Sequence, residues 1–407
     1  MSRHFKKIRV SVISDFLSTE IFGPSILAQK DFEVLNTNHR YECYLVSSSR
    51  MNLQGNGRNQ RIIRRSVVSD VFLFRFQSIR KLSTILSAIV RLVYGVRLTF
   101  VLLKLKPRIV VVHKIGFIFP IHVLLIMKLF FKNIIIVHHD FMFIHKGKVY
   151  PANLKISPLS LNDYDTFLSE NHFQLIHGPR KDLILVRNLT RKFLNVTYNQ
   201  FQKNLLINNG VSVDFVTRQT IEECRHDQFK YQSRQIDNRI RILFIGRSVG
   251  KGLDKAFEIL LANDIFSLTI ISELYTQELI PPELRESRVK FLGPKSQEEV
   301  FQEIHNSQVV FARSNCLEVG PLTVLEALSH GTPVICSPFS GNSEIAYQVD
   351  PNLISFEDDL DISHRIIELV DSWDSKLMKR RFWNVYASQP SVSMNYFVDS
   401  ICINSKK

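Results

Sequence analysis

Apolar residues along the chain follow two alternating patterns. Short runs rich in Val and Ile, such as residues 109–113 and 240–245, predict strands that are buried on both faces. Longer segments between such runs place apolar residues three and four positions apart, which is the spacing of one helical face. Because parallel strands need a helical crossover between them, this alternation predicts an α/β fold built on parallel sheets.

The predicted elements fall into two groups along the chain. The predicted strands cover residues 8–14, 41–46, 109–113, 134–138 and 193–197, and then 240–245, 267–271, 289–292, 309–312 and 333–336. The predicted helices include one that ends near residue 36, followed by 79–106, 118–131, 199–208, 253–261, 297–306 and 322–330. Residues 47–66 are polar and rich in Gly and Arg, and we expect a loop there.

A polar segment without a core pattern, residues 217–238, separates the two groups. A chain of 407 residues exceeds the size at which one hydrophobic core usually stops growing. We therefore expect two Rossmann-like domains, residues 1–217 and 218–385. The tail, residues 386–407, is expected to cross back to the first domain.

Charge is distributed unevenly between these halves. Residues 1–214 hold 31 Lys and Arg against 12 Asp and Glu, whereas the remainder holds 21 against 26. From Arg75 to His139 there are eleven basic residues and no acidic residue. The N-terminal half is therefore expected to meet an anionic partner, such as a lipid surface, a phosphorylated acceptor or nucleic acid.

The predicted helix 79–106 lies within this basic stretch. Its apolar positions occupy one arc, and its Lys and Arg residues fall on the rest. Such a helix either packs on a sheet with a solvated basic face or lies on an anionic leaflet, where each basic residue adds about 1 kcal/mol. The lack of acidic residues favours the second interpretation, membrane association.

Several features bear on the compartment. Residues 1–16 lack the apolar run of a signal peptide. The longest apolar stretch, residues 116–131, is broken by His122 and Lys128 and is shorter than a span of about 20 residues. The five cysteines are scattered, which indicates a reducing compartment. We expect a cytoplasmic protein, peripheral on the inner face of the cytoplasmic membrane.

Candidate chemistry lies mainly in the second half. Glu318 and Glu326 flank a Gly-Pro junction that opens a predicted helix. The amides of Leu322 and Thr323 at this helix start, together with the helix dipole, form an anion site, and the two carboxylates can accept hydrogen bonds from hydroxyl groups. The spacing alone fits an amphipathic core helix with a capping acid equally well.

Two further segments lie between a predicted strand and a helix. Residues 246–252 combine glycines, which let a backbone approach phosphate, with Arg247 and Lys251, which would neutralise two negative charges. This segment matches neither the dinucleotide fingerprint nor the P-loop. Residues 340–344 offer amides, an Asn and a carboxylate for sugar hydroxyls, although an N-capped helix with a first-turn acid explains them as well when taken alone.

In this order and spacing, the three segments resemble the C-terminal domain of family 4 glycosyltransferases, retaining enzymes of the two-domain GT-B fold. Glu318 and Glu326 match the family's Glu-x7-Glu pattern, residues 246–252 match its Gly-Arg…Lys-Gly loop, and residues 340–344 match its Gly-Gly-x-x-Glu segment. The resemblance departs from the family in a short Arg-to-Lys spacing of four, in a glycine only two residues after Glu318, and in Ser340, which replaces a glycine.

The first half resembles the family through two weaker features. Gly23 stands where a glycine-rich loop is usual, and His138 and His139 follow a predicted strand like the family's histidine segment. A histidine at a strand end is often structural, but ligands of open α/β sheets bind at the carboxyl ends of the strands. By this resemblance Gly23 and His138 belong to the acceptor side of the cleft, and His139 contacts donor sugar or acceptor.

The resemblance also implies roles for the C-terminal residues. Arg247 and Lys251 would bind the donor diphosphate, Glu326 the ribose hydroxyls, and Glu318 the sugar near its reacting carbon. The expected donor-binding set is Gly246, Arg247, Lys251, Gly252, Leu322, Thr323, Glu326, Gly341, Asn342 and Glu344. Neither a metal nor a cofactor is expected, because the basic pair and the helix dipole would stabilise the departing diphosphate.

The expected function is therefore that of a retaining glycosyltransferase, which moves a hexose from a UDP- or GDP-sugar to a lipid-linked or cell-surface glycan acceptor. A catalytically silent GT-B partner subunit is one alternative, because the loop from Arg247 to Lys251 is short. A basic nucleic-acid-binding protein is another, although no aromatic stacking motif accompanies the Arg and Lys residues. We expect the anionic membrane surface, bound through helix 79–106, rather than nucleic acid as the partner.

Overall fold

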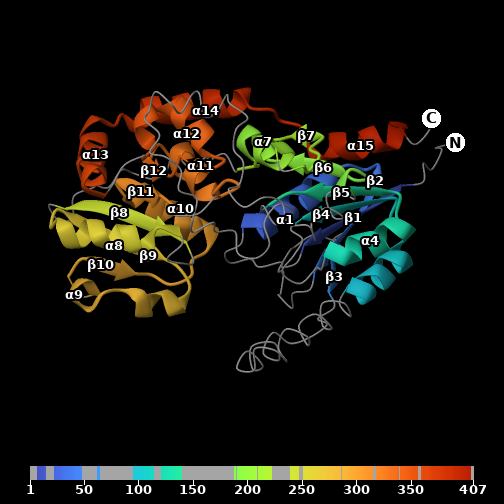
Figure 1. The fold of residues 1–407 in the computed structure, drawn as a ribbon, viewed down its shortest axis with the longest axis horizontal. Helices are drawn as coiled ribbons and strands as arrows, with labels where there is room; N and C mark the ends of the chain where they lie inside the picture. The colour runs from blue at the N-terminus through green and yellow to red at the C-terminus, as the bar shows by residue number, and fades with distance from the viewer. Residues whose placement is uncertain are drawn as a thin grey trace.

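The fold was analysed in a computed structural model of the 407-residue chain. The structure describes residues 7–14, 23–47, 62–64, 95–113, 121–139, 188, 190–208, 210–221, 239–246, 251–285, 287–314, 318–338, 340–355 and 359–404. Two α/β domains, each built on a parallel sheet, lie side by side along the long axis of the molecule (Figure 1). This is the architecture that the alternation of strand and helix patterns predicts.

The N-terminal domain is built on a parallel sheet with the strand order β3-β2-β1-β4-β5-β6-β7. Its strands are β1 (Ile8–Ser14), β2 (Tyr41–Ser47), β3 (Ile62–Arg64), β4 (Ile109–His113), β5 (Asn133–Val137), β6 (Leu194–Thr197) and β7 (Phe215–Val216). All five residues of β4 are buried, as expected for a strand with helices on both faces. The predicted loop 47–66 is corrected at its end, because Ile62–Arg64 pairs with β2 as a short edge strand.

Helices cover both faces of this sheet. They are α1 (Gly23–Asn36), a helix over residues 95–105, α4 (Ile121–Phe130) and α7 (Gln200–Asn208). Residues 95–105 are the described part of the predicted helix 79–106, and the remainder of that prediction lies outside the described residues. Figure 1 draws this helix and α4 below the sheet, on the side opposite the C-terminal helix.

The C-terminal domain has a second parallel sheet with the strand order β10-β9-β8-β11-β12. Its strands are β8 (Ile240–Ile245), β9 (Phe266–Ile271), β10 (Val289–Phe291), β11 (Val309–Ala312) and β12 (Val334–Cys336). Its helices are α8 (Leu253–Ala262), η2 (Leu274–Leu279), α9 (Pro282–Arg285), α10 (Gln297–Asn306), α11 (Leu322–Ser329), α12 (Ser343–Val349), η3 (Pro351–Leu353), α13 (Asp359–Ser372) and α14 (Ser375–Ser388). No helix in the described ranges is both long and apolar enough to cross a bilayer.

The order of strands fixes where a ligand site is expected. In each sheet the order in which successive strands are added reverses direction beside the first strand. This switch point lies between β1 and β4 in one domain and between β8 and β11 in the other. In open α/β sheets the crevice for ligands opens at the carboxyl ends of the strands at this point. The loops that follow these four strands are therefore the first place to look for chemistry.

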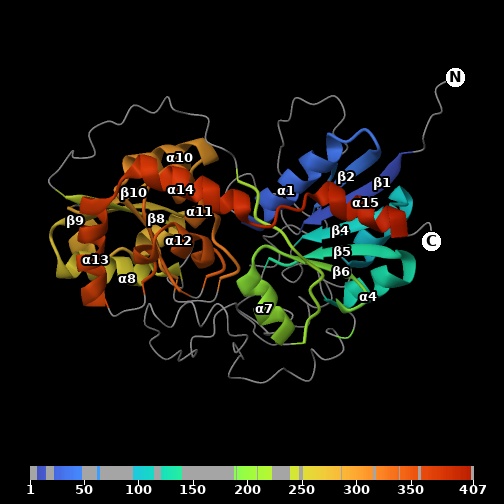
Figure 2. The ribbon, with the colours of Figure 1, turned by 90° about the horizontal axis from the view of Figure 1, so that it is seen from above.

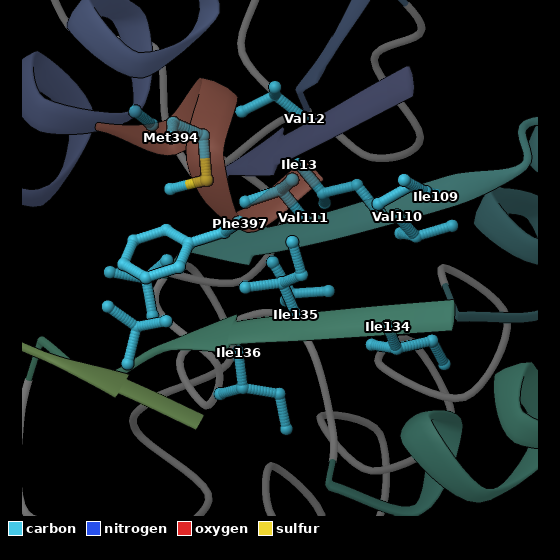
Figure 3. Close-up of a cluster of buried hydrophobic side chains, with 14 of the residues drawn as sticks. Val12, Ile13, Ile109, Val110, Val111, Ile134, Ile135, Ile136, Met394 and Phe397 are labelled. Carbon is cyan, nitrogen blue, oxygen red and sulfur yellow. The ribbon is translucent and has the colours of Figure 1, made fainter. Parts of the chain in front are cut away.

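The chain returns to the N-terminal domain at its end. After α14, residues 389–393 lead to α15 (Met394–Asn404), which lies over the N-terminal sheet in both views (Figures 1 and 2). Met394 and Phe397 point toward the strands β1, β4 and β5, where they join the buried cluster that fills this domain (Figure 3). The hydroxyl of Tyr41 donates a hydrogen bond to Asp399 at 2.6 Å, which fixes α15 to the start of β2.

Candidate active site

The loops after β8 and β11 meet at the switch point of the C-terminal sheet. Lys251 lies in the loop after β8, and Glu318 lies in the loop after β11. Their side chains form an ion pair in which the Lys251 ammonium donates to Oε1 of Glu318. The Glu318 side chain is 7% exposed and that of Lys251 35%, so a buried acid is neutralised by a cation that remains accessible.

Gly252 shows why this loop needs a glycine next to its lysine. Its φ is +90°, a left-handed value, and a Cβ there would lie 2.0 Å from the backbone oxygen of Arg313. This close approach joins the loop after β8 to the end of β11. Gly246 follows β8 directly and packs against the ring of Phe244, whereas Arg247 lies outside the described residues.

The segment after Glu318 leads into α11. This helix begins at Leu322 after Pro321, and no side chain caps its first turn. Leu322 and Thr323 are only partly buried, and the backbone N–H groups of a first helical turn lack helical acceptors. The predicted helix start is therefore present, and the anion site at it stays a prediction.

Glu326 lies one turn further along α11. Its Oε1 accepts a hydrogen bond of 2.9 Å from the side-chain amide of Gln297, at the start of α10. Glu318 thus pairs with the Lys251 cation, whereas Glu326 accepts from the neutral Gln297 amide. A carboxylate accepts several hydrogen bonds, and the ribose-binding role of Glu326 stays a prediction.

Residues 340–344 pack directly against the Glu318 segment. Ser340 forms a β-bridge with Glu318, and the amide of Gly341 donates to the Glu318 carbonyl at 3.0 Å. A Cβ on Gly341 would lie 1.9 Å from the Val319 carbonyl oxygen and 2.2 Å from the Asn199 side chain. Gly341 is therefore required where two loops and the other domain converge.

Asn342 and Glu344 have contacts that the sequence did not indicate. Asn342 is 2% exposed, and its side-chain nitrogen donates to Oε1 of Gln219 and to the Pro321 carbonyl. The partly buried Glu344 carboxylate accepts hydrogen bonds from the backbone amides of Gln200 and Phe201, the first residues of α7. Burial raises the pKa of Glu344 to about 7, against the opposing effect of those two amides.

The domains are joined through residues that follow β6 and β7. The Asn199 side chain donates to the Val319 carbonyl, and the Gln219 side chain donates to the Gly320 carbonyl at 2.9 Å. Sequence analysis missed both residues, and a polar side chain directly after a strand is the signal that could have revealed Asn199. These bonds hold the segment beside Glu318 against the N-terminal sheet.

His138 and His139 differ in their surroundings. His138 is 2% exposed, with Nε2 3.1 Å from Oδ1 of Asn195, and burial lowers its pKa to about 4. This is the setting of a neutral structural histidine. His139 is only partly buried, and its Nε2 lies 3.4 Å from the Tyr198 hydroxyl.

The remaining expectations concern Gly23 and metals. Gly23 is the first residue of α1, so the expected loop gives way to a helix start with Pro24 in its first turn. Within the described ranges, no group of three or more His, Cys, Asp and Glu residues is arranged to hold a metal ion. Metal-free chemistry stays a prediction.

Comparison with known families finds a match in the C-terminal domain. Residues 226–383 match the family model described as glycosyl transferases group 1, which confirms the resemblance at the level of group 1 glycosyl transferases. No curated protein matches the chain in sequence. The matched segment is the part of the chain that holds Lys251, Glu318 and Glu326.

Solved structures match nearly the whole chain. Sucrose-phosphate synthase (tll1590) from Thermosynechococcus elongatus aligns with a TM-score of 0.68 at 11% identity, covering 98% of this chain and 99% of that one. Anabaena Alr3699/HepE in complex with UDP and glucose aligns at 0.61 and 13%, covering 98% and 100%. WaaG, a glycosyltransferase involved in lipopolysaccharide biosynthesis, aligns at 0.58 and 12%, covering 93% and 94%. At these identities the likeness shows the fold, and the fold is GT-B.

Proposed function

We propose that this protein is a retaining glycosyltransferase that transfers a hexose from a UDP- or GDP-sugar to a lipid-linked or cell-surface glycan. The observation that carries the proposal is the set of contacts between the two domains. Tyr198 contacts His139, and the next residue, Asn199, bonds to Val319 beside Glu318. His139, expected to contact donor sugar or acceptor, and Glu318, expected to contact the donor sugar, are thus linked through Tyr198 and Asn199.

The charges of the C-terminal site fit a nucleoside diphosphate donor. The Lys251 ammonium and the start of α11 offer positive potential for the diphosphate, with Arg247 as a second cation. Glu326 accepts from the ribose, and Glu318 faces the sugar. During transfer the bond from the anomeric carbon to the phosphate oxygen breaks, the acceptor hydroxyl attacks from the same face, and its proton passes to the departing phosphate oxygen. Negative charge grows on the departing phosphate, where the cations stabilise it most.

The donor class draws support from the solved structures. HepE binds UDP and glucose, and WaaG acts in lipopolysaccharide biosynthesis, as their descriptions state. A UDP-hexose and a glycan of the cell envelope are accordingly the first substrates to test.

The surface of the N-terminal domain supports the proposal that the acceptor is bound to a membrane. Phe100, Leu129 and Phe130 are 61%, 81% and 54% exposed, on helix 95–105 and α4. Lys128 and Lys132 lie among them in the sequence, and the N-terminal half has a strong excess of positive charge. Apolar side chains with basic neighbours favour binding to an anionic leaflet. Such binding would hold the protein peripherally on the cytoplasmic membrane, close to a lipid-linked acceptor.

Two experiments test the proposal. Nucleotide release from UDP- and GDP-sugars is expected with wild type and is expected to be lost in Glu326→Ala, while Glu298→Ala on α10 serves as the control. Equal release by Glu326→Ala and wild type would reject the donor assignment, and no release by wild type from any donor would favour a silent partner subunit. For the membrane, flotation with anionic but not neutral liposomes is expected, and it should weaken in Leu129→Ser/Phe130→Ser.

A further inference from the structure

Gln219 lies in the segment 217–221, which leads from β7 toward the C-terminal domain. Its backbone carbonyl accepts a hydrogen bond of 2.6 Å from the Tyr386 hydroxyl on α14. The guanidinium carbon of the neighbouring Arg218 lies 4.3 Å from the centroid of the same ring, and its Nη1 donates to the Tyr386 carbonyl at 2.6 Å. The backbone of Gln219 is thus fixed to α14, and its side chain extends from a firm base.

The Gln219 side chain reaches the segment that follows Glu318. Its Nε2 donates to the Gly320 carbonyl at 2.9 Å, and its Oε1 accepts from Nδ2 of Asn342 at 2.9 Å. The same Asn342 nitrogen donates to the Pro321 carbonyl at 2.8 Å. Two successive backbone carbonyls are therefore held by two side chains, Gln219 and Asn342, which we call the amide pair.

The orientation of the amide pair follows from the carbonyl groups that it binds. A backbone carbonyl can only accept, so each amide must present its nitrogen to residues 320 and 321. The oxygen of Gln219 then faces Asn342 and accepts its second N–H. A flip of either amide would set oxygen against oxygen, and such a loss is costly because Gln219 is 4% and Asn342 2% exposed.

The amide pair also sets the direction of the first N–H group of α11. In a planar trans peptide the C=O and the N–H that follows it point in opposite directions. Because Asn342 holds the Pro321 carbonyl, the Leu322 N–H points away from Asn342. The Pro321 carbonyl also accepts from the Val324 amide nitrogen at 3.2 Å, so both of its lone pairs are used and this peptide plane is fixed from two sides.

We propose that Gln219 is a positioning residue, which acts with Asn342 to direct the Leu322 N–H toward the donor diphosphate. This inference rests on the proposed function for the identity of that anion. Gln219 lies outside the matched family segment, residues 226–383, and acts through backbone carbonyls from the connection between the domains. The connection thereby contributes to the shape of the donor site.

Hydrogen exchange of the full chain, followed by mass spectrometry, tests these contacts without a nucleotide. Gln219→Met keeps the length of the side chain but loses the amide. We expect faster exchange in peptides that cover residues 319–324 and unchanged exchange in α8. Gln348→Met, the same substitution at an exposed position of α12, is the control and should leave residues 319–324 unchanged. Unchanged exchange at residues 319–324 in Gln219→Met would overturn the proposal.

Nucleotide affinity distinguishes positioning from a general loss of stability. UDP carries the diphosphate, whereas uridine carries only the base and ribose; GDP and guanosine form the corresponding pair. We expect Gln219→Met to weaken UDP or GDP binding about 10-fold in equilibrium titration and to leave the affinity for the nucleoside nearly unchanged. Phe397→Ala, a buried substitution in the N-terminal core, should leave the ratio of the two affinities as in wild type. Equal weakening of nucleotide and nucleoside in Gln219→Met would reject the positioning role.

A second variant guards against a folding defect. Gln219→Asn retains an amide but is shorter by a methylene, so it cannot span Gly320 and Asn342 together. We expect it to change hydrogen exchange and nucleotide affinity in the same direction as Gln219→Met. Wild-type values for both measurements in Gln219→Asn would overturn the proposal.

The two measurements also separate this inference from the proposed function. If exchange at residues 319–324 rises in Gln219→Met but wild type binds neither UDP nor GDP, the proposed donor fails and the structural contacts of the amide pair stand. If wild type binds UDP or GDP and Gln219→Met binds it equally well, the positioning inference fails alone.

Discussion

The ammonium group of Lys251 forms an ion pair with the carboxylate of Glu318, so the cation proposed for the donor diphosphate is held against the acid proposed for the sugar. The two residues follow β8 and β11, the strands on either side of the switch point of the C-terminal sheet. An anion that binds here shares its cation with a buried carboxylate. If the proposed roles hold, donor affinity and catalysis are coupled through one lysine.

Removal of that lysine is expected to affect the site twice. In Lys251→Met the donor loses a cation, and the Glu318 carboxylate loses a partner that offsets its burial. We expect kcat/KM to fall about 100-fold and the melting temperature to drop, measured by nucleotide release and thermal unfolding. Lys255→Met, which breaks an accessible pair with Glu258 on α8, is the control and should change neither value strongly.

Replacement of Glu318, the other member of the ion pair, should separate nucleotide binding from turnover. Glu318→Gln leaves the shape of the side chain but releases Lys251 from its ion pair. We expect UDP or GDP to bind several-fold more tightly by isothermal titration, while turnover falls about 100-fold because the developing positive charge of the sugar loses its carboxylate. Weaker binding of the nucleotide would show that Glu318 helps the donor site rather than competing for its lysine.

Substitution of Gly341 tests how closely the two domains must pack. A methyl group there would overlap the Val319 carbonyl and the Asn199 side chain, and neither the backbone nor the buried amide can move away freely. Gly341→Ala should displace the Glu318 segment and abolish turnover. In Gly293→Ala the nearest atom is a flexible Leu274 methyl at 3.7 Å, so only the left-handed backbone costs about 1 kcal/mol and turnover should persist.

The strands and the helix starts could be predicted because they depend on local signals. Continuous Val and Ile runs mark buried strands, and Pro321 marks the beginning of α11. The partners of the site residues could not be predicted, because they come from the order of strands and from the other domain. His113 lies beside His139 only because β4 and β5 are neighbours, and Glu344 meets α7 only after the two domains join.

The C-terminal helix is a different case, because its signal was present in the sequence. Met394, Phe397, Val398 and Cys402 have the three- and four-residue spacing of a helical face, and all four are buried in the N-terminal core. The surrounding polar residues concealed this stripe, so the tail was predicted to cross back without being predicted as a helix.

This stripe leads to a stability prediction with neighbouring residues as test and control. Phe397 is 0% exposed and Tyr396 is 56% exposed, although both belong to α15. Phe397→Ala should lower the free energy of unfolding by about 3–5 kcal/mol, because it leaves a cavity over β4 and β5. Tyr396→Ala should lower it by less than about 1 kcal/mol in urea denaturation. Equal effects would mean that α15 does not complete the core.

Glu344 should make stability depend on pH near neutrality. Burial raises its pKa from 4.5 to about 7, so the folded protein binds this proton more tightly than the unfolded chain does. Its contribution to stability is complete below about pH 4.5 and is lost as the pH rises through about 7. Glu344→Gln carries no titrating proton, so wild type should lose stability relative to this variant between about pH 5 and about pH 8. Melting temperatures of both proteins across this range give the measurement. Glu298 is an exposed first-turn acid on α10, so the melting temperature of the control Glu298→Gln should follow that of wild type at each pH. If the melting temperature of Glu344→Gln also follows that of wild type, the Glu344 carboxyl group is already ionised where the two domains meet.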